Sequence, residues 1–123
     1  MNEDFVTFEL AKKLKEKGFP QRVFGTYGIY GAAYFEDGKF YRDGFICHKD
    51  EVYTAPTISQ VLNWLREEKK IYIELVIVVN AEYMCDIYKI DVRPIKCLGS
   101  TEYFKTYEEA AIAGIEYVID NLI

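Results

Sequence analysis

The sequence predicts an α+β domain in which three helices pack on an antiparallel sheet of four to five strands, in the order α-β-β-α-β-β-(β)-α. Apolar residues recur at helical spacing in three segments, and strand-like runs lie between those segments. Short turn signals separate neighbouring strands, which favours antiparallel pairing. The chain has 123 residues and no linker, repeat or low-complexity segment, so we expect one domain over residues 1–123.

The first helix is predicted to begin at Thr7, whose hydroxyl can cap it, and to end before Gly18. Residues 23–53 then change to a strand pattern that is rich in tyrosine and phenylalanine. Asp37-Gly38 and Asp43-Gly44 are both turn signals, but they lie so close that we expect only one full hairpin. Asp37-Gly38 is the favoured turn, and the sequence leaves the choice open.

The second helix is predicted to begin at Pro56-Thr57 and to close with Lys69 and Lys70, whose charges suit its C-terminal end. Trp64 lies at the edge of its core-facing stripe. The apolar residues of that stripe are Ile58, Val61, Leu62 and Leu65. The strand at 71–79 follows at once, and its apolar second half is typical of a central strand that is covered on both faces, or on one face and partly on the other.

Residues 83–92 are predicted to return as an antiparallel strand, and residues 95–98 to add a short edge strand after Pro94. The last helix opens with a capping box formed by Thr106 and Glu109. Gly114 lies inside this helix, where glycine costs about 1 kcal/mol against alanine. A close packing contact at Gly114 would offset that cost.

Charge and composition make several functional classes unfavourable. The net charge of −5 argues against nucleic-acid binding, which needs clustered positive charge. The longest apolar run, 75–79, is too short to cross a bilayer, and the acidic N-terminus does not resemble a secretory signal. Cys47, Cys85 and Cys97 leave one cysteine unpaired in any disulfide scheme, so we expect reduced thiols in a cytoplasmic protein.

Three stretches of the chain resemble a family of small uncharacterised proteins that occur in the genomes, phages and mobile elements of gut Bacteroidetes. They are Ala55-Pro56-Thr57 with Gln60, 64–68, Ile71 and Ile73; Tyr107–Ala111 with 113–115 and 121–123; and Phe8-Glu9 with 11–12, 14–15 and 17–19. The resemblance covers most of the helices and little of residues 24–53. It implies a cytoplasmic bacterial or phage accessory protein, and it transfers no catalytic residue.

Catalytic and ligand motifs are weak. Cys47 and His48 are adjacent, so on a strand their side chains would point to opposite faces and could not act as a nucleophile and base. The cysteine spacing matches no common zinc site. The glycines at 25, 28 and 31 form neither a dinucleotide-binding motif nor a phosphate-binding loop. We therefore assign no catalytic residue, metal or cofactor.

The aromatic excess points instead to a non-enzymatic module that binds another protein, or a second copy as a homodimer, through a tyrosine-rich sheet face or an edge strand. One alternative is a small-ligand or enzymatic cleft near Cys47, His48 and Tyr53. The other is an acidic decoy that engages a nucleic-acid-binding protein. The residues expected to form the interaction surface are Tyr27, Tyr30, Tyr34, Tyr41, Tyr53 and Trp64.

Overall fold

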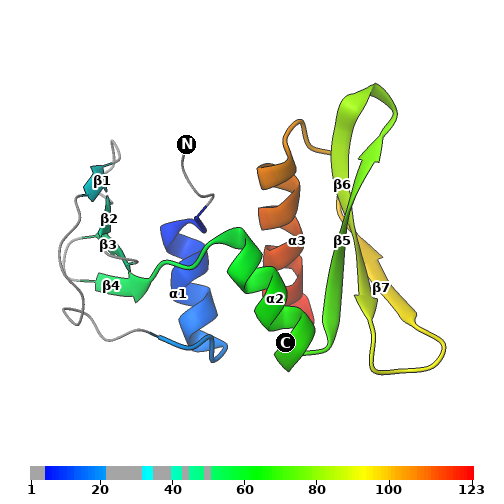
Figure 1. Cartoon of the computed structure of the whole chain (residues 1–123), viewed down its shortest axis with the longest axis horizontal. Coiled ribbons are helices and arrows are strands. Elements are labelled where there is room, and N and C mark those ends of the chain that lie inside the picture. The colour runs from blue at the N-terminus through cyan, green and yellow to red at the C-terminus, as the bar shows by residue number, and fades with distance from the viewer. Residues whose placement is uncertain (1–4, 22–31, 35–39, 43–44, 49–50) are drawn as a thin grey trace. The chain divides into compact units, whose positions relative to one another are not determined.

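The predicted α+β class, its three helices and the antiparallel pairing are confirmed by the computed structural model (Figure 1). The structure describes residues 5–21, 32–34, 40–42, 45–48 and 51–123, with the backbone alone at 32–34 and 40–42. The strands within these ranges form two sheets, of four and three strands, rather than one. The chain divides into two compact units, Met1–Thr57 and Ile58–Ile123.

The first unit combines one helix with the four-stranded sheet. Helix α1 (Phe8–Glu16) begins as predicted, because the Thr7 hydroxyl accepts a hydrogen bond from the Leu10 amide at 3.2 Å. Gly18 follows the helix with a φ of 95°, the left-handed conformation that favours glycine after a helix end. The strands pair in chain order and are β1 (Ala32–Tyr34), β2 (Phe40–Arg42), β3 (Phe45–His48) and β4 (Glu51–Thr54).

The expectation that two hairpins cannot fit between residues 34 and 45 is wrong. Strands β1 and β2 pair antiparallel across residues 35–39, and β2 and β3 pair antiparallel across residues 43–44. Both connections fit because β2 is three residues long. The two turn signals themselves, Asp37-Gly38 and Asp43-Gly44, lie outside the described residues.

The second unit is a three-stranded antiparallel sheet with two helices on one face (Figure 1). A short 3-10 turn, η1 (Val79–Ala81), joins the first two strands, and the chain order of the sheet is β5-β6-β7. Helix α3 packs on β5 and β6, and α2 packs on β5. The main elements are α2 (Ile58–Glu68), β5 (Ile71–Val78), β6 (Glu82–Lys89), β7 (Lys96–Ser100) and α3 (Tyr107–Asn121).

Strand β5 lies at an edge of its sheet, which corrects the expectation of a central strand. Ile71 and Ile73 face the helices and are buried, whereas Tyr72 is 41% exposed on the alternate side. The apolar second half of β5 is not buried on both faces, because Ile77 is 67% exposed. The continuous apolar run therefore leaves apolar side chains at the surface near the end of the strand.

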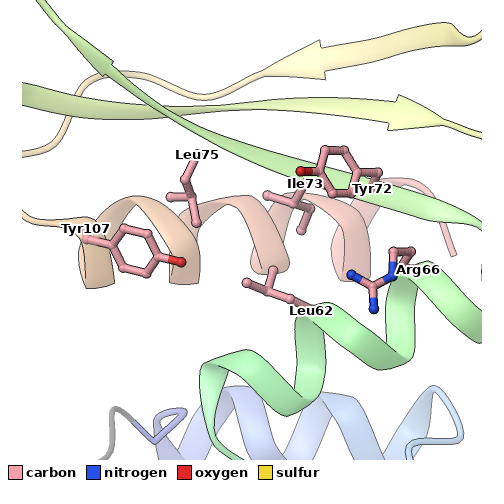
Figure 2. Close-up of a pocket in the computed structure, with 6 residues that line it drawn as sticks. All are labelled: Leu62, Arg66, Tyr72, Ile73, Leu75 and Tyr107. Atoms are coloured by element: carbon pink, nitrogen blue, oxygen red, sulfur yellow. The ribbon is translucent and has the colours of Figure 1, made fainter.

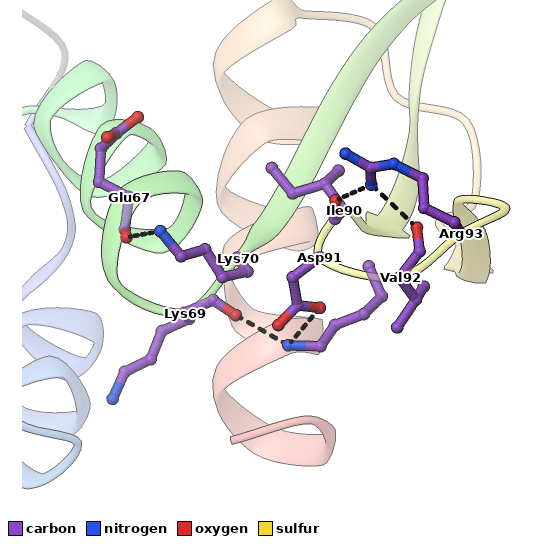
Figure 3. A network of polar contacts seen from close by, with 8 residues as sticks. Glu67, Lys69, Lys70, Ile90, Asp91, Val92 and Arg93 are labelled. Atoms are coloured by element: carbon purple, nitrogen blue, oxygen red, sulfur yellow. Dashed lines mark hydrogen bonds and ion pairs between the residues drawn. The ribbon is translucent and has the colours of Figure 1, made fainter.

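Lysine side chains hold the C-terminal end of α2, where the last carbonyl groups lack helical partners (Figure 3). The Lys70 ammonium donates to the Glu67 carbonyl at 2.8 Å, which confirms the predicted role of Lys70. The Lys89 ammonium donates to the Lys69 carbonyl at 3.2 Å and pairs with Asp91 at 3.2 Å. Lys70 has a φ of 58°, and the chain turns there directly into β5.

Helix α3 approaches the sheet closely at Gly114. The predicted capping box is present, with the Thr106 hydroxyl accepting from the Glu109 amide at 3.1 Å and the Glu109 carboxylate accepting from the Thr106 amide at 3.2 Å. A Cβ atom placed on Gly114 would lie 3.0 Å from Cys85 Sγ and 3.2 Å from Ile73 Cγ2. The predicted close contact at this glycine is therefore confirmed.

We expect Gly114→Val to lower the free energy of unfolding by about 1–3 kcal/mol, because the added methyl groups would overlap Cys85 and Ile73. Ala113→Val is the control, since Ala113 is only half-buried on the same helix. Helix propensity alone would favour Gly114→Val and disfavour Ala113→Val, so a larger loss at Gly114 reports the close contact. Chemical denaturation measures both changes. Equal destabilisation by the two variants would contradict the close packing of α3 at Gly114.

Candidate functional site

A cleft of about 350 Å³ lies beside β5 in the second unit, with α2 on its other side (Figure 2). Arg66 and Tyr72 lie at one end, Leu75 and Tyr107 at the other, and Leu62 and Ile73 between them. The volume is at the low end of the roughly 300–1,000 Å³ typical of small-molecule pockets. The cleft therefore suits a few side chains better than a large cofactor.

Helix α2 presents two of these residues from positions four apart. Val61 and Leu65 are fully buried and fix the orientation of the helix on the unit. Leu62 and Arg66 lie on an adjacent side of the helix, because residues four apart share one face. One helix thus supplies both an apolar and a positively charged group to the cleft.

The backbone of β5 has a regular inner and outer edge. The Ile90 amide donates to the Lys70 carbonyl at 3.0 Å, so the hydrogen-bonded pairs of the β5–β6 ladder continue at every second residue from there. The β5 members of these pairs are Tyr72, Glu74, Val76 and Val78. Each of them directs its amide and its carbonyl group toward β6. The residues between them direct their amide and carbonyl groups away from β6. We call the backbone groups of Ile71, Ile73, Leu75 and Ile77 the outer edge of β5.

Within the described ranges no strand pairs with this outer edge. The same residues turn their side chains toward the helix-covered face, and Ile73 and Leu75 line the cleft. Outward backbone groups and a cleft that is partly lined by apolar side chains therefore occur side by side.

Tyr107, the first residue of α3, closes the apolar end of the cleft. The capping box fixes the start of α3, and the Tyr107 ring packs edge-to-face with Tyr83 of β6 at 6.2 Å between centroids. Partial burial raises the pKa of the Tyr107 hydroxyl above its usual value. The hydroxyl therefore stays protonated at neutral pH, where it can donate or accept a hydrogen bond.

The other face of this sheet satisfies its polar groups within itself. Ser100 donates to Asp86 at 2.6 Å, and the Tyr88 hydroxyl donates to Glu74 at 3.4 Å. Burial of the ring, together with the neighbouring Asp86 carboxylate, raises the pKa of Tyr88. These cross-strand contacts are those of a solvated surface.

The structure describes the side chains of only two of the residues predicted to form a tyrosine-rich surface, so this surface stays a prediction. Tyr27 and Tyr30 lie outside the described residues, and Tyr34 and Tyr41 are described by their backbone alone, in β1 and β2. Trp64 is 9% exposed, and the Lys69 ammonium lies 5.2 Å from the centroid of its ring. The sixth residue, Tyr53, is half-buried in β4.

Tyr53 packs against its own unit. Its ring lies edge-to-face on Phe8 of α1 at 5.3 Å, and its hydroxyl donates to Glu51 at 2.6 Å. This hydrogen bond and the Lys12 ammonium at 3.3 Å lower the pKa of Glu51, while the Glu51 carboxylate raises the pKa of Tyr53 to about 12. Neither group changes its charge near neutral pH, whereas the ideal pKa of a general acid or base lies near the operating pH.

Cys47 and His48 do not form a nucleophile–base pair. His48 contacts the Phe8 ring edge-to-face at 5.5 Å, and the alternation of β3 directs Cys47 to the opposite face, where it is 4% exposed. Among the residues that the structure describes, no three histidine, cysteine or acidic side chains are grouped so that they could hold a metal ion.

Comparisons with protein-family models, with curated proteins and with solved structures find no match to this chain. None of the helices in the described part of the chain combines the length and the apolarity that a membrane span requires.

The cleft is the feature that sequence reasoning missed. Leu62 fits a core stripe and Arg66 fits a solvated helix face, so neither residue stands out in the sequence. Its one available signal was the short connection from α2 to β5, which places the helix beside the strand that follows it. Whether β5 would be an edge strand could not be read from its apolar pattern.

We expect an alkylating reagent such as N-ethylmaleimide to modify Cys97 rapidly and Cys85 slowly in the native protein. Cys97 is exposed, whereas Cys85 is buried with its thiol donating to the Ala110 carbonyl at 3.0 Å. Burial raises the pKa of Cys85 to about 11, so the reactive thiolate is scarce near pH 8. Mass mapping of the labelled peptides over time measures both rates.

The Cys97→Ser variant should lose the rapid phase, and denaturant should expose Cys85 to the reagent. Modification of native Cys85 as fast as Cys97 would contradict the burial of this thiol under α3.

Proposed function

We propose that the protein is a protein-interaction module, of the bacterial or phage accessory type that the family resemblance implies, and that it binds an extended segment of a partner along the outer edge of β5. The observation that carries this proposal is the juxtaposition of outward backbone groups at Ile73 and Leu75 with a cleft that is lined by both apolar and polar side chains. Peptides that add a strand to a sheet use this combination, with the backbone providing affinity and side-chain pockets providing specificity.

The two edge strands of this sheet, β5 and β7, differ in a way that supports the choice of β5. Strand β7 has five residues, begins at the exposed Lys96, and pairs with β6 through a register shift opposite Ile87 and Tyr88. Charged residues, short length and bulges discourage unwanted strand pairing. Strand β5 has eight residues in uninterrupted register with β6, so its outer edge is the better template for an added strand.

Each added main-chain hydrogen bond contributes about 0.5–1.5 kcal/mol net, and burial of a leucine-sized side chain contributes about 1.5–3 kcal/mol. Ordering the peptide opposes both terms. The cleft is small, so we expect a weak and reversible complex rather than a permanent one.

The matched test uses linear peptides selected against the intact protein from a random displayed library. We expect Leu62→Glu to weaken the binding of selected peptides by about tenfold or more, because it removes the apolar leucine contact and adds a carboxylate that can pair with Arg66 four residues later. Ser59→Glu is the control, since it adds the same charge to an exposed position of the same helix. Titration calorimetry measures both affinities.

A second pair of variants tests the backbone contact. Both variants remove the leucine side chain at position 75. Leu75→Pro also removes an outward amide, without breaking the β5–β6 ladder, whereas Leu75→Ala keeps that amide. Weaker binding by the proline variant than by the alanine variant supports strand addition, provided that circular dichroism shows both to be folded. Selected peptides whose affinity none of these cleft variants changes would contradict the proposed function.

A further inference from the structure

Arg66 is the one positively charged residue among those that line the cleft, and it lies at the end opposite Leu75 and Tyr107 (Figure 2). Its Nη2 donates to Asn63 Oδ1 at 2.6 Å, and its Nε donates to Glu67 Oε2 at 3.1 Å. These contacts use two of the five N–H donors of a guanidinium and hold its plane in place. The cleft therefore has a positive end and an apolar end.

The existing Glu67 contact does not prevent another carboxylate from binding Arg66. The side chains of Arg66 and Glu67 are 46% and 58% exposed, and ion pairs of this kind contribute about 0–1 kcal/mol. A partner carboxylate that engages the guanidinium with two hydrogen bonds, on a peptide already held by the β5 backbone, would form a stronger contact.

We propose that the partner segment carries a carboxylate for Arg66 and, two residues away, an apolar side chain for the Leu75–Tyr107 end of the cleft. This inference rests on the proposed strand addition. In an extended peptide, every second side chain faces the same side at a spacing of roughly 6.6 Å. One face of the added strand can therefore present one group to each end of the cleft.

A second copy of this chain is a poorer match to the cleft. In an antiparallel pairing of β5 with β5 about a two-fold axis, the partner's helix-side residues would be its own isoleucines and leucine, at positions 71, 73, 75 and 77. Glu74 would lie on the opposite face of the joined sheet. Arg66 would then find no carboxylate from the added strand, so charge complementarity favours a different, acidic segment.

A carboxylate can come from an aspartate or glutamate side chain or from the C-terminus of the partner. Two libraries of linear peptides distinguish these sources, one with free C-termini and one with amidated C-termini, each selected against the intact protein. We expect enrichment of an acidic residue two positions from an apolar residue in both libraries. Enrichment confined to free C-termini would identify the terminal carboxylate as the ligand for Arg66.

Arg66→Gln should weaken the selected acidic peptides by about tenfold, the loss typical of a charged hydrogen-bond partner. Arg66→Glu should shift the selected preference from acidic to basic residues. Arg93→Gln is the matched control, because Arg93 is an exposed arginine of the same unit that donates to the carbonyls of Ile90 and Val92 and does not line the cleft. It should leave peptide affinity unchanged.

The outcomes separate this inference from the proposed function. Peptides that need Leu62 but show no acidic preference, or lose nothing in Arg66→Gln, would overturn the carboxylate inference and leave strand addition standing. If no peptide is selected, or if the binding of selected peptides ignores Leu62→Glu, strand addition itself is wrong. A stable dimer in light scattering that Leu75→Pro dissociates would assign the edge to a second copy and would also overturn the carboxylate inference.

Discussion

Strand β5 is bound along one edge and covered on one face, and the organisation of the second unit depends on this constraint. Its inward backbone groups pair with β6, and its helix-side residues Ile71 and Ile73 are buried under the helices. The close approach of α3 at Gly114, which contacts Ile73 and Cys85, sets the depth at which these side chains lie. The outer edge of β5 directs its amide and carbonyl groups away from β6, and the cleft lies between this edge and α2.

The large pKa shifts in the second unit and at Tyr53 move groups away from neutrality. Efficient general acids and bases have pKa values near the operating pH. Here burial moves the Cys85 thiol to a pKa of about 11, and a hydrogen bond moves Tyr53 to about 12, both away from neutrality. Arg66 offers a different kind of group, a guanidinium whose side chain is accessible at the end of the cleft.

Much of the fold could be predicted because local rules decide it. The Thr106–Glu109 capping box, the cap at Thr7 and the small residue at Gly114 each depend on neighbours within the helix or on one contact surface. Strand β5 is an edge strand because, in the described residues, only β6 pairs with it. The residue pattern within 71–79 does not indicate how many neighbours the strand has. The number of short strands before residue 54 was likewise missed, because three-residue strands such as β2 carry almost no periodic signal.

The candidate site could not be predicted for a related reason. The interaction surface expected from the abundance of tyrosine stays a prediction, and Tyr53 uses its ring and hydroxyl within its own unit. The cleft residues have ordinary individual environments, and their significance arises from the tertiary placement of α2 beside an outer strand edge.

Residue-resolved amide hydrogen exchange of the protein without any ligand tests the central claim most directly. If the outer edge of β5 is available, protection should alternate along the strand. The Glu74 and Val76 amides, which face β6, should exchange slowly, and the Leu75 and Ile77 amides should exchange much faster. Uniform slow exchange from 73 to 77 would show that these outward amides are already hydrogen-bonded and would contradict the account.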